Sequence, residues 1–345
     1  MSISMLSYSG ILTKVRAMES HLMTEEDYKK IASLESTTDF VNYVRNNPSY
    51  APLFNNYDEQ TLHRGQIEHI LTNSIYLEFA KIYRFANQSQ RKALSIIFFR
   101  YEVNILKCCL QNVFSEDNTH DLLAFEDFFL IHSELKVKEL ASAPTIEAFI
   151  NLLNGTEYYP LFSKLYATSH NTLQDFEIQL DIYYFKKVWK QKDRLLSGKN
   201  LKAATLLYGV QIDLLNLLWI YRSKKFFDIE SGKILANIIP INYKLSKEQI
   251  GRLVEAVSIE EFMKIVDTTY YAKVYGTIEF DTLEDVYLRV LSKLYKVCSE
   301  KYRTSMAPIL TFLYAKSMEL DYLTTALECI RYQLDPSEIL SYILH

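Results

Sequence analysis

The sequence predicts an all-α protein built from three similar helical bundles, and three observations lead to this prediction. Glycine and proline are sparse, at 8 and 7 in 345 residues, which disfavours a chain of strands and tight turns. Apolar residues recur at the helical spacing i, i+3, i+4 and i+7 within residues 145–162. Related copies of that stretch occur at residues 36–54 and 258–275, so the chain contains an internal repeat of about 110 residues.

Each copy of the repeated stretch is expected to form a short helix that closes in a tyrosine-rich turn. Ser36, Thr145 and Ser258 stand where each short helix needs an N-cap. Ser258 also matches the S-x-x-E capping box with Glu261. The tyrosines of the turns are expected to close each repeat against its neighbour: Tyr50, Tyr158 and Tyr271.

A pair of long helices is predicted to accompany each copy. The first pair is SIYLEFAKIYRFA with IIFFRYEVNILKCCL, the second is DIYYFKKVWKQKDRLL with LLYGVQIDLLNLLWIYR, and the third is DVYLRVLSKLYKVCSEKY with MELDYLTTALECIR. Placing Asn104 against Asn216 and Thr325 gives spacings of about 112 and 109 residues. The long helices therefore repeat with the same period as the short ones.

The repeats are expected to close on themselves. The predicted units are residues 1–99, 100–210 and 211–318, and the C-terminal helices in residues 319–345 complete the first unit. If those helices pack beside the N-terminal helix SGILTKVRAMESHL, the three bundles form a funnel-like ring. A closed ring does not need the polar caps that open repeat arrays carry.

Charge and composition exclude several classes of function. The net charge of −4 gives no global basic field for nucleic acid. Four cysteines without CxxC spacing are interpreted as buried small hydrophobes in a reducing compartment: Cys108, Cys109, Cys298 and Cys329. The start of the chain has no signal-peptide pattern, and apolar runs such as LLWIY fall short of a membrane span. A soluble intracellular protein is expected.

No motif for chemistry is present in the sequence. It contains no P-loop, no H-E-x-x-H zinc motif and no G-x-S-x-G nucleophile elbow. Acidic pairs such as Glu25-Glu26 and Glu260-Glu261 fall in first helical turns, where the helix dipole favours carboxylates without a catalytic role. A non-catalytic protein is therefore predicted, without cofactor, metal or small-molecule substrate.

One local cluster of positive charge stands out in a chain whose net charge is negative. Its candidate residues are Lys186, Lys187, Lys190 and Arg194. The cluster is either a solvated helix face or a patch that meets acidic loops of a partner or anionic lipid headgroups. Trp189 nearby would also allow RNA contact, but no RNA-binding pattern accompanies it, and no nucleic-acid partner is predicted.

Four stretches together resemble a known family. They are the opening TKVRAMESHLMTEEDYKKIASLES, the segments YEVNILK and QIDLLNLLWIYRSKKFF, and the ending ALECIRYQLDPSEILSYIL. With the repeat, they resemble the C subunit of prokaryotic V-type (A/V-type) ATPases, whose counterpart in the eukaryotic pump is the d subunit. The resemblance implies an all-helical funnel that sockets the central shaft onto the membrane rotor ring and transmits torque for transport of H⁺ or Na⁺.

The resemblance also implies partners and a location. The partners would be the D- and F-type shaft subunits, the rotor ring of c-type subunits and other ATPase subunits, on the cytoplasmic face of the membrane. Polar residues in the matching stretches are candidate shaft contacts: Arg16, Glu19, Asn104, Lys107, Asn216, Arg222 and Arg331. The alternative is that they bridge one bundle to another. Leu110 stands where Arg222 and Arg331 stand, which argues against a symmetric ring of arginines.

Two rival functions remain on the residues alone. A helical-repeat scaffold for cytosolic partners would account for the repeat, but a period of about 110 residues is far from the roughly 34 of TPR units. An all-helical enzyme with an aromatic pocket would need titratable groups clustered in a cavity.

Overall fold

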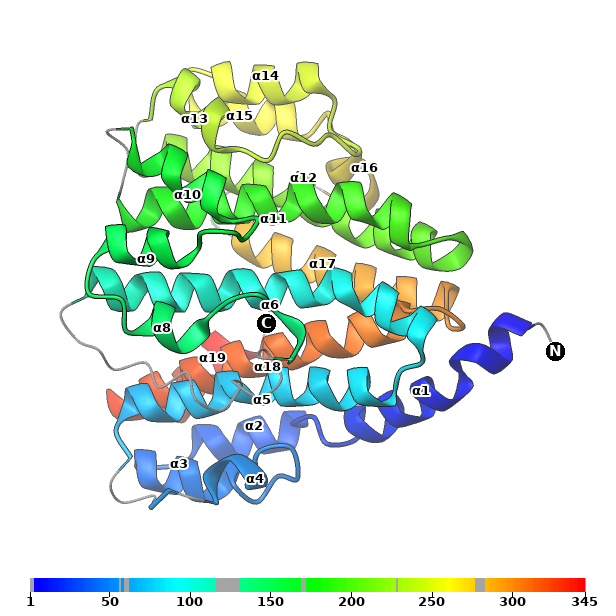
Figure 1. Ribbon diagram of the computed structural model, residues 1–345, viewed down its shortest axis with the longest axis vertical. Coiled ribbons are helices and arrows are strands. Elements are labelled where there is room, and N and C mark those ends of the chain that lie inside the picture. Colours follow the sequence, from blue (N-terminus) through cyan, green and yellow to red (C-terminus); the bar gives the residue numbers. More distant parts are fainter. Residues whose placement is uncertain are drawn as a thin grey trace. The chain divides into compact units, whose positions relative to one another are not determined.

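The computed structural model describes residues 3–55, 57–58, 62–115, 131–168, 172–227, 229–276 and 283–344 (Figure 1). Within these ranges every regular element is a helix and no strand occurs, so the predicted all-α class is confirmed. The chain divides into two compact units. We call residues Met1–Leu173 with Ile309–His345 unit 1, and residues Gln174–Pro308 unit 2.

Unit 1 combines the two ends of the chain. Its helices are α1 (Ile3–Glu19), α2 (Glu25–Ala32), α3 (Thr37–Val44), α4 (Ala51–Phe54), α5 (Arg64–Phe85), α6 (Gln88–Phe114), α8 (Val137–Ala141), α9 (Ile146–Leu152), α10 (Tyr159–Tyr166), nearly all of α18 (Ala307–Arg331), and α19 (Pro336–Ile343). Figure 1 shows α6 and α18 running in the same direction, with α5 antiparallel to both.

Unit 2 is formed by the middle of the chain. Its helices are α11 (Leu173–Leu195), α12 (Gly198–Lys225), α13 (Ser231–Asn237), α14 (Lys247–Glu255), α15 (Ile259–Val266), α16 (Tyr270–Tyr275) and α17 (Leu283–Lys301).

The long helices that the sequence predicts are present among the described residues. In chain order they are α5 and α6, α11 and α12, and α17 and α18, of which α17 belongs to unit 2 and nearly all of α18 to unit 1. The first helices of the pairs begin at residues 64, 173 and 283, so successive pairs start 109 and 110 residues apart. Two residues join α5 to α6 and two join α11 to α12, which makes each pair a tight hairpin.

The short helices begin at the predicted N-caps. The side chains of Ser36, Thr145 and Ser258 each accept a hydrogen bond from the backbone N–H three residues later. The reciprocal half of the predicted capping box is not formed at Ser258. Glu261 Oε2 accepts instead from the backbone N–H of Val257, at 2.9 Å, because the carboxylate reaches one residue further back.

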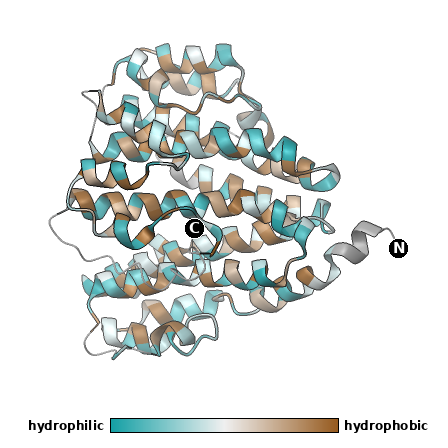
Figure 2. Cartoon of the chain, in the orientation of Figure 1, coloured by the Kyte–Doolittle hydropathy of each residue, from teal (hydrophilic) through white to brown (hydrophobic). Residues whose placement is uncertain are grey.

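The helix α12 corrects one expectation from the sequence. It is long and apolar enough to cross a membrane by length and composition, although 72% of its apolar window is buried inside the protein. It packs against α13, α15 and α17 of unit 2. A helix that is apolar around its whole circumference is typical of a core element, and Figure 2 shows apolar residues along much of α6 and α12.

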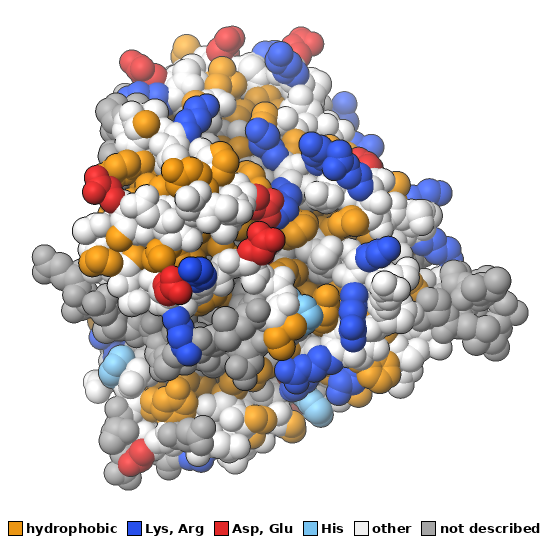
Figure 3. All heavy atoms as spheres, viewed as in Figure 1, with side chains coloured by type: hydrophobic (Ala, Val, Ile, Leu, Met, Phe, Trp, Pro, Cys, Tyr) orange, Lys and Arg blue, Asp and Glu red, His pale blue; other side chains and the backbone are white. Residues whose placement is uncertain are grey.

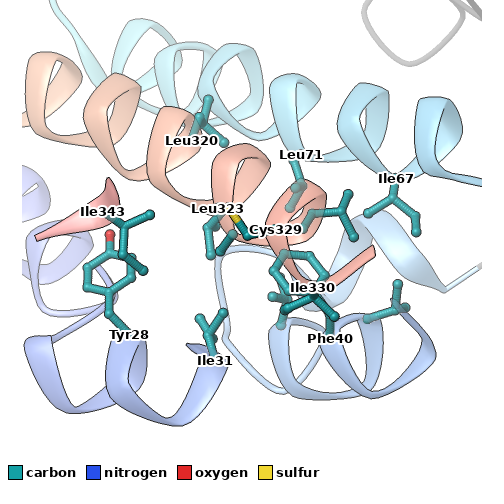
Figure 4. Close-up of a cluster of buried hydrophobic side chains, with 14 of the residues drawn as sticks. Tyr28, Ile31, Phe40, Ile67, Leu71, Leu320, Leu323, Cys329, Ile330 and Ile343 are labelled. Carbon is teal, nitrogen blue, oxygen red and sulfur yellow. The ribbon is translucent and has the colours of Figure 1, made fainter. Parts of the chain in front are cut away.

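The core of unit 1 joins the C-terminal helices to the N-terminal ones (Figure 4). Ile31 of α2, Phe40 of α3, Leu323 of α18 and Ile343 of α19 are each fully buried in one apolar cluster. Each such side chain contributes about 1.5 to 3 kcal/mol through burial, which outweighs an exposed ion pair worth about 0 to 1 kcal/mol. In detail, α19 packs against α2, whereas α1, the expected neighbour, packs along α5.

The four cysteines are unpaired by disulfides. Cys109, Cys298 and Cys329 are buried, as predicted, but Cys108 is half-buried. Burial raises the pKa of the Cys109 thiol above its usual range, which keeps that side chain a neutral hydrophobe.

Candidate functional site

The tyrosines of the repeated stretch each donate a hydrogen bond to a carboxylate on the second long helix of a pair. Tyr50 donates to Glu319 Oε1 at 2.6 Å, and Tyr158 donates to Glu102 Oε2 at 3.2 Å. In unit 2, Tyr271 donates to Asp213 Oδ2 at 2.8 Å. All three phenols are buried, at 0 to 2% exposed, so each needs such a partner.

These contacts correct the expected role of the tyrosines. Tyr158 and Tyr271 bond to acids within their own predicted repeats, not to a neighbouring repeat. Tyr50 bonds to a residue 269 positions later, in the C-terminal segment. The acids were missed because a lone Glu or Asp in a long apolar helix has no distinctive spacing. The signal that the sequence offered was a single acidic residue on an otherwise apolar helix face.

The Glu319 pair in unit 1 contains a buried ammonium. Lys316 Nζ lies 2.6 Å from Glu319 Oε1 and 3.8 Å from the centre of the Tyr50 ring, and its side chain is 1% exposed. The second carboxylate oxygen accepts the backbone N–H of Met23. Burial lowers the pKa of Lys316, while Glu319 acts in the opposite direction. This arrangement joins α18 to the turns that begin α2 and α4.

The Asp213 pair in unit 2 is built on backbone donors instead. The carboxylate accepts N–H groups of Tyr243, Lys244 and Leu245 at 3.1, 2.6 and 3.0 Å, besides the Tyr271 phenol. Burial raises the pKa of Asp213, and these four hydrogen bonds oppose the rise. The carboxylate therefore fixes the loop between α13 and α14 to the middle of α12.

The Tyr243 ring in that loop packs directly on the backbone of α12. A Cβ at Gly209 would lie 2.5 Å from the ring, so glycine is required for this close approach. Tyr243 also meets Trp189 edge-on at 6.2 Å between ring centres.

The Glu102 pair in unit 1 borders a pocket of about 450 Å³. Glu102 is buried and accepts a hydrogen bond from Ser133 as well as from Tyr158. The other lining residues come from the end of α5, from α6, from residues 132–135 and from the turn before α10: Tyr83, Ser95, Phe98, Phe99, His132, Glu134, Leu135, Thr156 and Glu157.

Among the candidate shaft contacts, Asn216 is enclosed in the core of unit 2. Its amide donates to Ile239 O at 2.9 Å and accepts from Ile239 N at 2.8 Å, and the residue is 0% exposed. It therefore fixes one segment of unit 2 to another, and we do not retain it as a contact residue. Asn104 is half-buried and hydrogen-bonds Tyr76 of α5, which also favours the bridging alternative.

The charged candidates are more accessible. Arg16, Arg222 and Arg331 are exposed, whereas Glu19 and Lys107 are half-buried. Burial raises the pKa of Glu19, and the charge of Arg16 opposes that rise. Arg331 pairs with Glu328 at 2.8 Å and lies over the Tyr332 ring.

Arg222 and Arg331 lie near helix ends that also present exposed aromatic rings. After α12, Phe226 and Phe227 are 60% and 66% exposed, and after α18 Tyr332 is 64% exposed. Cations at a helix C-terminus are favoured by the dipole, and Arg with aromatic neighbours is a common composition of interface anchors. The sequence reasoning named the arginines but missed the rings beside them. Leu110, at the corresponding place on α6, is fully buried.

The basic cluster lies on α11 in unit 2. Lys186, Lys190 and Arg194 are exposed and Lys187 is half-buried. Figure 3 shows Lys and Arg side chains gathered over the part of unit 2 that carries the turn from α11 to α12. Lys192, in the same stretch, is buried instead: it pairs with Asp193 at 2.8 Å and lies 4.2 Å from the centre of the Trp189 ring.

Comparison with known proteins covers nearly the whole chain. The family model described as "ATP synthase (C/AC39) subunit" matches residues 11–342. The C subunit of the A-type ATP synthase from Methanosarcina mazei is 24% identical over 91% of this chain and 86% of its own length. The proteins of the same name from Methanocaldococcus jannaschii and Pyrococcus horikoshii are each 23% identical, over 100% and 96% of this chain and 88% and 89% of their own lengths.

Proposed function

Because this chain belongs to the ATP synthase (C/AC39) subunit family, we propose that it is the non-catalytic central-stalk adaptor of a rotary V-type ATPase. It sockets the central shaft onto the membrane rotor ring on the cytoplasmic side and transmits torque for ion transport. The match over residues 11–342 is the observation that carries the proposal. The partners are shaft subunits of the D and F type and the ring of c-type subunits.

The recurring tyrosine and carboxylate contacts support three similar bundles closed into a funnel-like ring. Each contact fixes a short-helix turn to the middle of a long helix, at Tyr50, Tyr158 and Tyr271. A torque-bearing part needs this kind of internal fixation, because a directional buried hydrogen bond resists sliding between elements better than apolar contact alone. The family match and these contacts together favour the adaptor over a scaffold for unrelated partners.

We assign the two exposed arginine ends to the shaft and the basic cluster of α11 to the ring side. Arg222 and Arg331 can form charge-assisted contacts that resist rotation. Lys186, Lys187, Lys190 and Arg194 provide a positive patch for acidic loops of the ring or anionic headgroups around it.

The test is capture of the purified chain by shaft subunits and by the detergent-solubilised ring, separately and together. The adaptor proposal expects capture of both, with Arg222→Glu plus Arg331→Glu weakening the shaft arm. Lys190→Glu plus Arg194→Glu should weaken the ring arm. Lys92→Glu and Lys247→Glu, which reverse exposed charges elsewhere, serve as matched controls. Failure to capture either component at low and physiological salt would overturn the proposal.

A further inference from the structure

The pocket beside Glu102 has the size of a small-ligand site. Its volume of about 450 Å³ lies within the range of roughly 300 to 1,000 Å³ that such sites occupy. Four separate segments of unit 1 contribute its walls. One wall is the buried Glu102 carboxylate, held in place by Ser133 and by the Tyr158 phenol.

The charge of the lining favours a cation. Glu102, Glu134 and Glu157 line the pocket, and no lysine or arginine does so among the described residues. Arg91 is not part of the lining, but its guanidinium carbon lies 5.3 Å from the centre of the Tyr83 ring. Partial burial and the charge of Arg91 lower the pKa of His132, so this imidazole of the lining is neutral at neutral pH.

The aromatic content of the lining favours an organic cation over a metal ion. Tyr83, Phe98, Phe99 and Tyr158 contribute rings to the pocket. Such faces attract ammonium and guanidinium groups and also pack against an alkyl chain. No group of three metal-ligating side chains converges within the described part of the chain.

A second tyrosine and glutamate pair of unit 1 already binds an ammonium, supplied by the chain itself. Lys316 Nζ lies 2.6 Å from Glu319 and 3.8 Å from the centre of the Tyr50 ring. This contact shows that a buried tyrosine and glutamate pair in unit 1 can bind an ammonium group.

We propose that the pocket beside Glu102 binds a primary alkylammonium group. The ammonium bonds to Glu102 near the Tyr158 ring, and its alkyl chain lies against Tyr83 and Phe99 toward the rim at Glu134 and Glu157. The group belongs either to a lysine side chain of a protein partner or to a free polyamine.

The test uses butylammonium as the probe and the full chain at neutral pH and low salt, with binding measured by saturation-transfer NMR titration. We expect a dissociation constant on the order of 1 mM, and binding at least about tenfold weaker for 1-butanol, which has the same chain without the charge. Equal binding of the alcohol would reduce the site to an apolar pocket and overturn the proposal.

Variants separate the ligand role of Glu102 from its structural one. Glu102→Gln should weaken butylammonium binding by about tenfold. Glu134→Gln and Glu157→Gln, at exposed rim positions where the fold is not at risk, should each weaken it by about two- to threefold. Glu255→Gln, an exposed acid of unit 2, is the control and should leave binding unchanged. Unchanged binding in both rim variants and in folded Glu102→Gln would exclude the site.

Two further probes identify the source of the ammonium. Spermidine binding about tenfold more tightly than Nα-acetyl-lysine methylamide supports a free polyamine. Binding of the lysine amide at least as tight as that of spermidine, and abolished by Nε-acetylation, supports a protein lysine. If neither binds while butylammonium does, both proposed sources of the ammonium group are excluded.

Discussion

Unit 1 and unit 2 each bury a tyrosine hydroxyl against a carboxylate, but the other groups around that carboxylate differ between the two units. In unit 1, the carboxylate that accepts from Tyr50 faces the buried ammonium of Lys316. In unit 2, the carboxylate that accepts from Tyr271 faces three backbone N–H groups. The ion pair leaves a second charge buried if it is broken, whereas backbone donors are neutral. We therefore expect the loss of these two contacts to lower the unfolding free energy by different amounts.

The two tryptophans make this comparison measurable, because Trp189 and Trp219 both belong to unit 2. Tryptophan fluorescence therefore follows the unfolding of unit 2. Far-UV circular dichroism follows the helices of both units.

The largest effect is expected from Glu319→Ala in unit 1. This change leaves Lys316 buried without its counter-charge and removes the acceptor of Tyr50, so the free energy of unfolding should fall by about 3 to 5 kcal/mol. Urea unfolding should show the loss by circular dichroism while the fluorescence transition stays in place. The double variant Lys316→Met with Glu319→Leu should recover the part of the loss that comes from the unpaired charge, but not the part that comes from the lost acceptor of Tyr50 and Met23. An equal shift in both probes would show that the units unfold together.

A smaller loss is expected from Asp213→Asn in unit 2. The amide keeps the shape but presents N–H donors toward backbone N–H groups, which costs about 2 to 3 kcal/mol. Here the fluorescence transition should move to lower urea concentration. Asp267→Asn, at an exposed acid of the same unit, is the comparison variant and should shift it much less. A loss as large as that of Glu319→Ala would contradict the distinction between ionic and neutral partners.

Alkaline pH should distinguish the units further. Burial, followed by the charge of Asp213, raises the pKa of Tyr271 above its usual value near 10. The folded state therefore keeps a proton that the unfolded chain releases. Stability from this group is complete below about pH 10 and falls above it by about 1.4 kcal/mol per pH unit. Tyr271→Phe should reduce the decrease in the free energy of unfolding of unit 2 between about pH 10 and 12, as measured by fluorescence.

Lys316 should offset part of the alkaline loss caused by Tyr50 in unit 1. Burial and Glu319 raise the pKa of Tyr50, but burial lowers that of Lys316. The unfolded chain then binds the lysine proton more strongly, so this group contributes stability that rises with pH up to about 10.5. Lys316→Met, which removes the offsetting group, should therefore steepen the alkaline fall in the unfolding free energy of unit 1, followed by circular dichroism near pH 10. An unchanged slope would refute this compensation.

The smallest effect is expected where α18 ends. Gln333 has φ of 55°, in the left-handed region, whereas the corresponding turn after α16 uses Gly276 with φ of 91°. Gln333→Gly should stabilise unit 1 by about 0.5 to 1 kcal/mol. Gly276→Ala should destabilise unit 2 by more, about 1 to 3 kcal/mol, because a φ of 91° with a ψ of 178° is adopted almost only by glycine. The two transitions should move in opposite directions in urea.

Helix positions and caps could be read from the sequence because they depend on local residues. The N-caps at Ser36 and Thr145 were predicted correctly, since capping needs only the next few residues. The contacts of Glu319 and Asp213 could not be predicted from the sequence, because their tyrosine partners lie 269 and 58 residues away. Asn216 could not be assigned for the same reason: the choice between a shaft contact and a bridge inside the protein depends on its partner, which is the backbone of Ile239.

The contact between Tyr50 and Glu319 also has a consequence for the order of events during synthesis. The N-terminal helices α2 to α4 leave the ribosome long before α18, since 269 residues separate the two partners. At about 5 to 20 residues per second, the delay is roughly 15 to 50 seconds. During that time Phe40 and Ile31 lack the C-terminal half of their core. The nascent chain therefore exposes an apolar surface that is covered only when translation is nearly complete, which makes this segment a natural client for chaperones.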